Sequence, residues 1–215
     1  MKIALDLTPL RPVETGVDRF ILNLVEGLSE VDHDNNYVLF INQGDQSRLP
    51  GLDRSRWKVI PVRAETIWHR LLFQQIEMPM RMKREGVGVL HSLAFLAPLW
   101  TPGLKQILSV HDMTFFTRPE LHNQMRRSVW FRWLVARSIG RADHLIVPTR
   151  SVRGDLLRLF TKRDPETLHV VKYGLNPRFR PRTPKAMTVV RQRLGLPQHY
   201  ILFVGTLEPR KNLHR

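Results

Sequence analysis

The residues best suited to grip an anionic ligand stand near the end of the chain, at Arg210 and Lys211. They follow Gly205, in a segment that comes directly after the apolar run 200–204. A planar guanidinium beside a compact ammonium can hold a diphosphate through a fork and a point charge. An ordinary basic turn has the same composition, so the pair by itself leaves both interpretations open.

His111 and Asp112 form a second pair that could do chemistry. They follow the apolar segment 106–110, and parallel sheets bind their ligands at the carboxyl ends of such strands. The histidine can hydrogen-bond a ligand hydroxyl, while the aspartate can fix the tautomer of the ring or accept from a substrate. A structural histidine at a strand end is the alternative. That alternative is the better interpretation for His91, one strand earlier.

Two further motifs concern anions and metals. Gly16 stands where a helical pattern begins, and it would let an anionic ligand approach the free N–H groups there, although a simple turn would also need it. Asp32, His33 and Asp34 have the spacing of metal-binding acids, but with the asparagines that follow they fit a surface turn better. No metal and no cofactor is predicted.

The composition of the chain narrows the classes of function. The net charge of +15 favours a nucleic acid, an anionic lipid surface or a phosphorylated small molecule. Between His122 and Arg163, ten Lys or Arg residues face two Asp, so about half of that excess lies in one stretch. The chain has no cysteine, which excludes disulfides and is compatible with the cytoplasm. No apolar run approaches the roughly 20 residues that cross a bilayer, and Asp6 argues against a signal peptide.

Alternating strands and helices must position these residues. Helical periodicity predicts helices from Gly16 to Leu28 and over 66–84, 123–140 and 150–160, the second one interrupted near Pro79. Apolar runs predict strands at residues 2–7, 37–41, 57–62, 87–90, 106–110, 144–147 and 168–172. Strands that alternate with helices form βαβ units, so the predicted fold class is α/β with a doubly wound parallel sheet.

The character of the sequence changes after Lys172. Residues 173–184 include three prolines and are typical of an interdomain linker. A short helix over 184–194, capped by Thr183 and ended by Gly195, precedes a strand at 200–204. The expected organisation is one domain at 1–180 and the beginning of a second, incomplete domain at 181–215.

Segments along the whole chain resemble, in order, the sequence pattern of glycosyltransferase family four, retaining enzymes with the GT-B fold of two facing Rossmann-like domains. Two departures are Thr149, where the family usually has serine, and Lys172-Tyr173-Gly174, where Pro-Asn-Gly is more typical. They leave the family resemblance intact and weaken any assignment to a subgroup. The matching segments are 16–20, 91–92, 109–112, 142–149, 170–176 and 205–213.

The resemblance implies an enzyme that moves a sugar from a nucleotide-sugar donor to a saccharide or lipid-linked acceptor, with retention and without metal. It implies that Arg210 and Lys211 contact the donor diphosphate, that His111 lies beside the donor sugar, and that the loop with Gly16 lies next to the donor. Residues 1–180 would be the acceptor-side Rossmann-like domain. The family also uses a pair of glutamates in the donor domain, which do not occur before Arg215, so this chain alone is expected to be inactive.

A last group of residues suggests a surface for docking. Trp130 and Trp133 share one side of the expected helix 123–140 with Arg126, Arg137 and Arg141. Interleaved tryptophan and arginine suit an anionic membrane surface or a lipid-linked acceptor, which predicts a cytoplasmic protein, peripheral on the inner face of the membrane. Tryptophans packed under a loop, with solvated arginines, would give the same pattern.

Two functions of other classes remain open at this point. The chain could be a basic module without catalysis that docks on a membrane or a partner protein. It could also bind nucleic acid, which only its charge supports, since it contains no helix-turn-helix, zinc-finger or RNA-binding signature. Nucleic acid is therefore not the expected partner.

Overall fold

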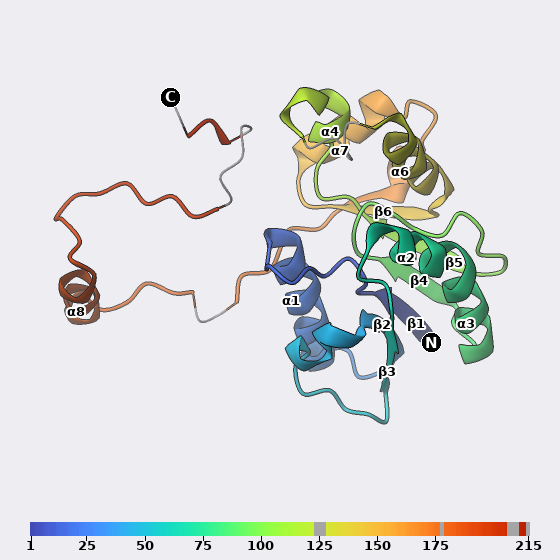
Figure 1. Cartoon of the computed structure of the whole chain (residues 1–215), viewed down its shortest axis with the longest axis horizontal. Coiled ribbons are helices and arrows are strands. Elements are labelled where there is room, and N and C mark those ends of the chain that lie inside the picture. Colours follow the sequence, from blue (N-terminus) through green and yellow to red (C-terminus); the bar gives the residue numbers. More distant parts are fainter. Residues whose placement is uncertain (123–127, 177–178, 206–210, 214–215) are drawn as a thin grey trace. The chain divides into compact units, whose positions relative to one another are not determined.

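The computed structural model describes residues 1–122, 128–176, 179–205 and 211–213 (Figure 1). The chain divides into two units, Met1–Tyr173 and Gly174–Arg215. Within the described residues, no helix combines the length and the apolar character needed to cross a bilayer.

A sheet of seven parallel strands, in the order β3-β2-β1-β4-β5-β6-β7, forms the centre of the first unit. The order reverses between β1 and β4, where Asp6 pairs with Ser92 at the carboxyl edge. This reversal is the topological switch point at which open α/β sheets bind ligands. The predicted Rossmann-like α/β class is confirmed. The strands are β1 (Lys2–Asp6), β2 (Asn36–Asn42), β3 (Trp57–Val62), β4 (Val89–Ser92), β5 (Lys105–Ser109), β6 (His144–Val147) and β7 (Leu168–Val170).

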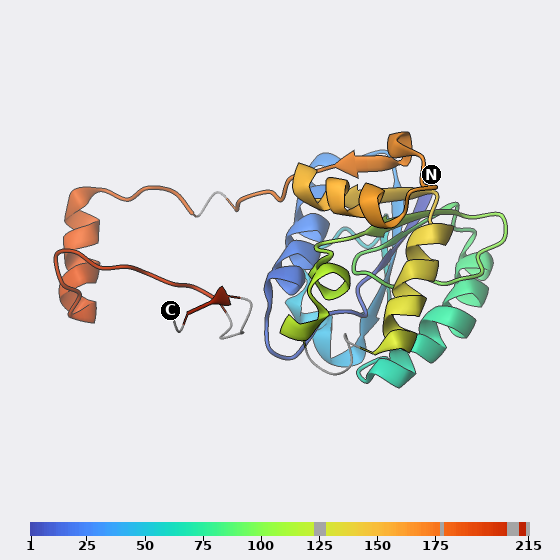
Figure 2. The ribbon, with the colours of Figure 1, turned by 90° about the horizontal axis from the view of Figure 1, so that it is seen from above.

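Helices cover both faces of the sheet (Figure 2). On one face α1 (Gly16–Val31) buries Ile21 and Val25 against the first strands. The other face is covered by α2 (Ile67–Leu72), the π-helical turn η2 (Phe73–Glu77) and α3 (Met78–Glu85), which follow one another without a break. Right-handed crossovers require this division, because the chain moves in opposite directions on the two sides of the switch point. The remaining helices among the described residues of this unit are α4 (Thr114–Thr117), α6 (Val129–Arg141) and α7 (Arg150–Leu159), with short 3-10 turns at Gln43–Arg48, Pro119–Leu121 and Pro165–Thr167.

The interruption expected near Pro79 takes the form of the π-helical turn. Pro79 has no N–H for the carbonyl four residues earlier, and the backbone widens just before it, so that Met78 N–H bonds to the carbonyl of Phe73. Most other boundaries lie within two or three residues of the predictions. The expected start of the helix 123–140 falls largely on residues outside the described part. Within the described residues, α6 begins at Val129.

In the second unit, α8 (Pro184–Leu194) has the predicted ends. The Thr183 hydroxyl accepts from the N–H of Ala186, and Gly195 takes the left-handed conformation with φ of 61°. The predicted strand at 200–204 is wrong for this structure: these residues form no strand, and the side chain of Ile201 is fully exposed. A strand needs a neighbour for its N–H and C=O groups, and the described residues of this unit offer none.

Candidate functional site

The loop between β1 and α1 lies at the carboxyl edge of the sheet, beside the switch point. The carboxylate of Asp18 holds this loop. It accepts hydrogen bonds from the N–H groups of Arg11 and Thr15, both at 2.7 Å, and from the Thr15 hydroxyl. This arrangement is a capping box that fixes the entry of the chain into α1. Gly16 follows, and a Cβ built on it would meet no other atom within 4 Å. The absence of a side chain there is therefore not required by packing within the described residues and leaves the helix end open to a ligand.

His111 lies directly beyond β5, at the same edge of the sheet, and its ring is held on every side. Its Nε2 is 2.7 Å from the carbonyl oxygen of Leu93, and its Nδ1 is 2.6 Å from the hydroxyl of Tyr173. Because a carbonyl can only accept, Nε2 carries the proton and Nδ1 accepts from Tyr173. Phe20 from α1 and Phe95 meet the ring edge-on, with centroids at 4.9 and 5.6 Å.

The electrostatics of this ring favour the neutral form. Burial lowers the pKa of His111, and the bond to Leu93 and the charge of Asp112 only partly oppose that shift. Burial and the charge of Asp112 raise the pKa of Tyr173 to about 12, so its hydroxyl keeps its proton at neutral pH. Both ring nitrogens are engaged, so a sugar hydroxyl can reach His111 only by replacing the Tyr173 hydroxyl at Nδ1. A neutral Nδ1 would then accept from it without placing a positive charge beside it.

Asp112 has partners of its own. Its Oδ1 accepts from the N–H of Thr114 at 3.1 Å and from the Thr114 hydroxyl at 2.8 Å, which begins the short helix α4. The expectation that Asp112 fixes the tautomer of His111 is therefore wrong, because the Leu93 carbonyl does so. The sequence could not predict this partner, because every residue has a backbone carbonyl and nothing marks that of Leu93. The second role expected for Asp112, accepting from a substrate, stays a prediction.

His91 has the structural role that its sequence context favours. It is buried, and its Nε2 is 2.9 Å from the hydroxyl oxygen of Ser109. Burial and, to a lesser extent, the neighbouring His111 lower the pKa of His91 to about 4. The ring is thus a neutral part of the core beneath His111.

We expect His91 to make the fold sensitive to mild acid. Its folded pKa lies below the ordinary value of 6.5, so the unfolded chain takes up the proton first and stability falls as the pH drops from 6.5 towards 4. The loss reaches on the order of 3 kcal/mol only below the folded pKa, and about 2 kcal/mol of it falls between pH 7.5 and 5.0. Urea unfolding at pH 7.5 and 5.0 measures it. The His91→Gln variant should lose much of this slope, and an unchanged slope would contradict the assignment.

Asp6 and Gln74 form a buried polar link that the sequence pattern does not predict. Asp6 is fully buried at the end of β1 and accepts from the N–H and hydroxyl of Thr8 at 3.0 and 2.7 Å and from Gln74 Nε2 at 2.6 Å. Burial raises the pKa of Asp6, and the hydrogen bonds from Thr8 and Gln74 oppose the shift. The link ties the π-helical turn to the loop after β1. The one feature of the sequence that could have indicated this link is Asp6 itself, an acid in an otherwise apolar strand.

The other predicted site residues are not all brought together. Arg210 and Arg126 lie outside the described residues, and Lys211 is exposed in the second unit. On α6, Trp130 and Trp133 are 40% and 53% exposed, and the Arg137 guanidinium lies 5.3 Å over the Trp133 ring.

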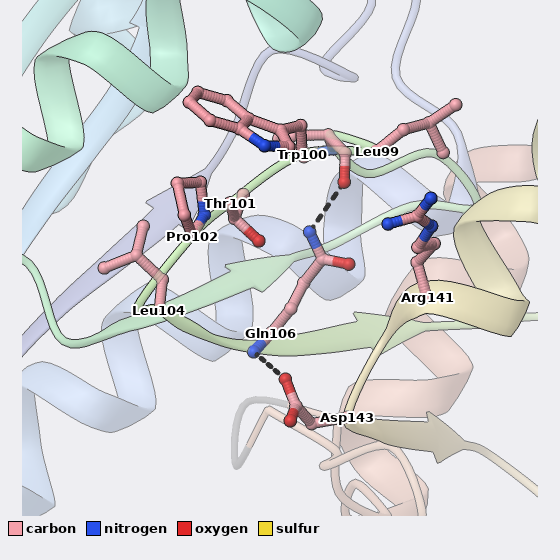
Figure 3. Close-up of a pocket in the computed structure, with 9 residues that line it drawn as sticks. Leu99, Trp100, Thr101, Pro102, Leu104, Gln106, Arg141 and Asp143 are labelled. Carbon is pink, nitrogen blue, oxygen red and sulfur yellow. Dashed lines mark hydrogen bonds between the residues drawn. The ribbon is translucent and has the colours of Figure 1, made fainter.

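Arg141 lies on the same side of α6 as Trp130 but at the far end of the helix, and its place in the predicted docking surface stays a prediction. It stands about three turns beyond Trp130 along α6, roughly 16 Å away at 1.5 Å per residue. There it lines a cavity of about 240 Å³ with Trp100, Gln106 and Asp143, at the amino ends of β5 and β6 (Figure 3). This cavity lies at the edge of the sheet opposite His111.

The Asp32-His33-Asp34 segment is the surface turn expected from its sequence. The Asp32 carboxylate accepts from the hydroxyl of Tyr37, from the side-chain amide of Asn35 and from the N–H of Asp34. These bonds hold the pKa of Asp32 well below its usual range. Its oxygens are thus used by the protein itself.

Comparisons with known proteins bear on the family and the fold of the chain. The model of Glycosyltransferase Family 4 matches residues 15–179. The O-antigen chain mannosyltransferase B of Escherichia coli is 29% identical over 110 residues, which are 51% of this chain and 28% of that protein. The chain therefore spans well under two thirds of this curated relative.

Two solved structures share the fold at low identity. A glycosyltransferase from Rickettsia africae ESF-5 superimposes with a TM-score of 0.53 at 14% identity, over 92% of this chain and 50% of that one. The UDP-GlcNAc 2-epimerase from Methanocaldococcus jannaschii gives 0.52 at 13% identity, over 80% and 46%. At such identities the likeness concerns the fold alone, whereas the family model covers most of the sequence. The chain belongs to Glycosyltransferase Family 4.

Proposed function

We propose that this chain is the acceptor-side part of an enzyme that transfers a sugar from a nucleotide-sugar donor to a saccharide or lipid-linked acceptor, with retention and without a metal ion. The observation that carries the proposal is the neutral, half-buried His111 at the switch point of the sheet. Its ring is held rigidly by Leu93, Phe20 and Phe95, as a group that orients a sugar hydroxyl must be. The family supports a cytoplasmic location, where nucleotide-sugars are made.

The donor diphosphate would be neutralised by Arg210 and Lys211. A leaving group with this much charge needs cationic or N–H donors in the transition state, and two basic side chains supply what a metal ion supplies elsewhere. The open helix end at Gly16 would offer further backbone N–H donors to an anionic ligand. In this scheme His111 orients the transferred sugar, and Asp112 can accept a hydrogen bond from the acceptor.

The test is a transfer assay with the longest polypeptide that the gene encodes. A panel of uridine, guanosine and adenosine diphosphate sugars is offered with saccharide and polyprenyl-linked acceptors, in buffer containing EDTA. We expect release of nucleoside diphosphate from one donor class and a product whose anomeric configuration, read by NMR, is that of the donor. Inversion or a need for divalent metal would contradict the mechanism. Binding of no nucleoside diphosphate at all would favour a docking module without catalysis.

Lys211 offers a direct check of the diphosphate site. We expect Lys211→Gln to weaken the binding of the cognate nucleoside diphosphate by about tenfold, since the substitution removes one charge-assisted hydrogen bond to the diphosphate. Isothermal titration calorimetry measures the dissociation constant. Lys185→Gln, which removes a charge from the exposed start of α8, is the matched control and should leave it unchanged. Equal affinities for both variants would exclude Lys211 from the site.

A further inference from the structure

A stripe of exposed apolar side chains runs along the helical segment that covers the sheet after β3. Trp68, Leu72, Ile76 and Met80 are 66%, 55%, 53% and 49% exposed and follow one another every four residues. In a regular α-helix three such steps would turn the stripe by about 120°. The π-helical turn η2 lies in the middle of the segment and unwinds part of this rotation, which keeps the four side chains on the solvent side.

The stripe continues onto the neighbouring helix α6. The rings of Trp68 and Trp130 are stacked, with centroids 5.4 Å apart and planes inclined by 20°. Trp133, one turn further, is 53% exposed. Beneath the surface, Ile67 and Leu71 of α2 pack against the same core as α6, so the two helices lie side by side on one face of the sheet (Figure 2). We call the six exposed residues Trp68, Leu72, Ile76, Met80, Trp130 and Trp133 the apolar face.

Basic side chains accompany the apolar face. The only acids on α2, η2, α3 and α6 are Glu77 and Glu85, and both form salt bridges, with Arg81 and Lys58. The Arg137 guanidinium lies against Trp133, so charge and aromatic ring share one position. The same helices carry seven basic residues, namely Arg70, Arg81, Lys83, Arg84, Arg132, Arg137 and Arg141.

We propose that the apolar face docks on an anionic lipid surface. Aliphatic and indole groups that enter the headgroup region, surrounded by Arg and Lys that meet lipid phosphates, are the pattern of an interfacial helix. The tryptophan pair alone could also stack on a saccharide. Leu72, Ile76 and Met80 add aliphatic surface, however, and burying that surface is favourable only against an apolar partner. The face extends for about 18 Å along its helices, away from the sheet edge that carries His111.

Docking in this way would present a lipid-linked acceptor to that edge. Trp68 and Trp130 stand at the start of their helices, and helices that follow strands begin at the carboxyl edge of the sheet. The presentation of an acceptor rests on the proposed sugar transfer. The binding of lipid does not depend on it. The two are measured separately.

The experiment is sedimentation of the chain with vesicles in the absence of any nucleotide-sugar. Vesicles of phosphatidylcholine alone are compared with vesicles in which about a third of the lipid is phosphatidylglycerol. We expect binding to the anionic vesicles that weakens with salt, together with a blue shift of tryptophan fluorescence. The variant Leu72→Gln with Ile76→Gln should bind about tenfold more weakly, and Arg137→Gln about fivefold.

A matched control keeps the experiment specific. The variant Val31→Gln with Trp100→Gln removes two hydrophobic side chains, 75% and 67% exposed, that lie outside the apolar face. It should bind anionic vesicles within twofold of the unmodified chain, because these two side chains would not enter the lipid surface. The four substituted apolar positions are more than half exposed, and circular dichroism checks that every variant folds.

Three results would overturn the proposal. One is the absence of binding to anionic vesicles, and another is equal binding by the face variants and the control. The third is a dimer in sedimentation velocity that persists in the presence of vesicles and is absent for the face variants. A second copy of the chain would then occupy the apolar face. Lipid binding without sugar transfer would count only against the proposed function, and transfer without lipid binding only against this inference.

Discussion

His111→Ala is expected to lower the kcat of sugar transfer by about 100- to 1000-fold, the usual cost of losing an orienting hydrogen bond at a reacting centre. The ring is neutral and rigidly held, so its contribution is to position a sugar hydroxyl that takes the place of the Tyr173 hydroxyl at Nδ1 as the bond to the leaving diphosphate breaks. Such an interaction is strongest in the transition state. We therefore expect the loss mainly in kcat, with KM for the donor changed much less.

Steady-state kinetics of the longest gene product, with the donor that the panel identifies, measures this effect. Tyr173→Phe is the matched control, because it keeps an aromatic ring at that position and removes only the bond to His111 Nδ1. It should lower kcat less than tenfold, since Leu93 still fixes the tautomer. A kcat within threefold of the parent for His111→Ala would remove His111 from the catalytic site.

Asp6→Ala is expected to lower the free energy of unfolding by about 3–5 kcal/mol, the largest stability effect at the site. The change leaves three buried donors, two on Thr8 and one on Gln74, without an acceptor. Asp6→Asn should behave quite differently. The Oε1 atom of Gln74 is buried and has no hydrogen-bond partner among the described residues, so rotation of that amide would let it accept from the side-chain NH₂ group that the substitution introduces.

The pH dependence of these variants gives an independent check. Burial raises the folded pKa of Asp6 above 3.8, so its protonated form favours folding and that contribution is lost as the pH rises through the folded pKa. Asparagine is neutral throughout, so Asp6→Asn should be at least as stable as the parent at pH 7. Urea titrations at pH 4 and pH 7 measure both effects. A loss of several kcal/mol for Asp6→Asn at pH 7 would show that Gln74 cannot rotate.

The sequence was sufficient for the sheet because its strands are buried on both faces and therefore stand out as apolar runs. Trp57–Val62 and His144–Val147 have the bounds that the pattern predicts. The strand predicted at 200–204 has an equally apolar sequence. It fails because a strand depends on pairing that no local pattern encodes.

The candidate site was predictable only in part. His111 and Gly16 could be found because a strand end and a helix start mark them. The partners of His111 could not, since one is a backbone carbonyl of Leu93 and the other, Tyr173, lies 62 residues away. The stack of Trp68 on Trp130 was likewise hidden, because α2 and α6 become neighbours only through the folded core.

The π-helical turn can also be regarded as the trace of a single inserted residue. Removing one residue from Phe73–Glu77 would restore a regular α-helix and rotate everything after it by about 100°. Met78 and Met82, which now fill the core, could then not be buried together with Phe73. Homologous chains shorter by one residue at this point must therefore cover the sheet with a helix of different phase, and they should lack the apolar stripe on its outer side.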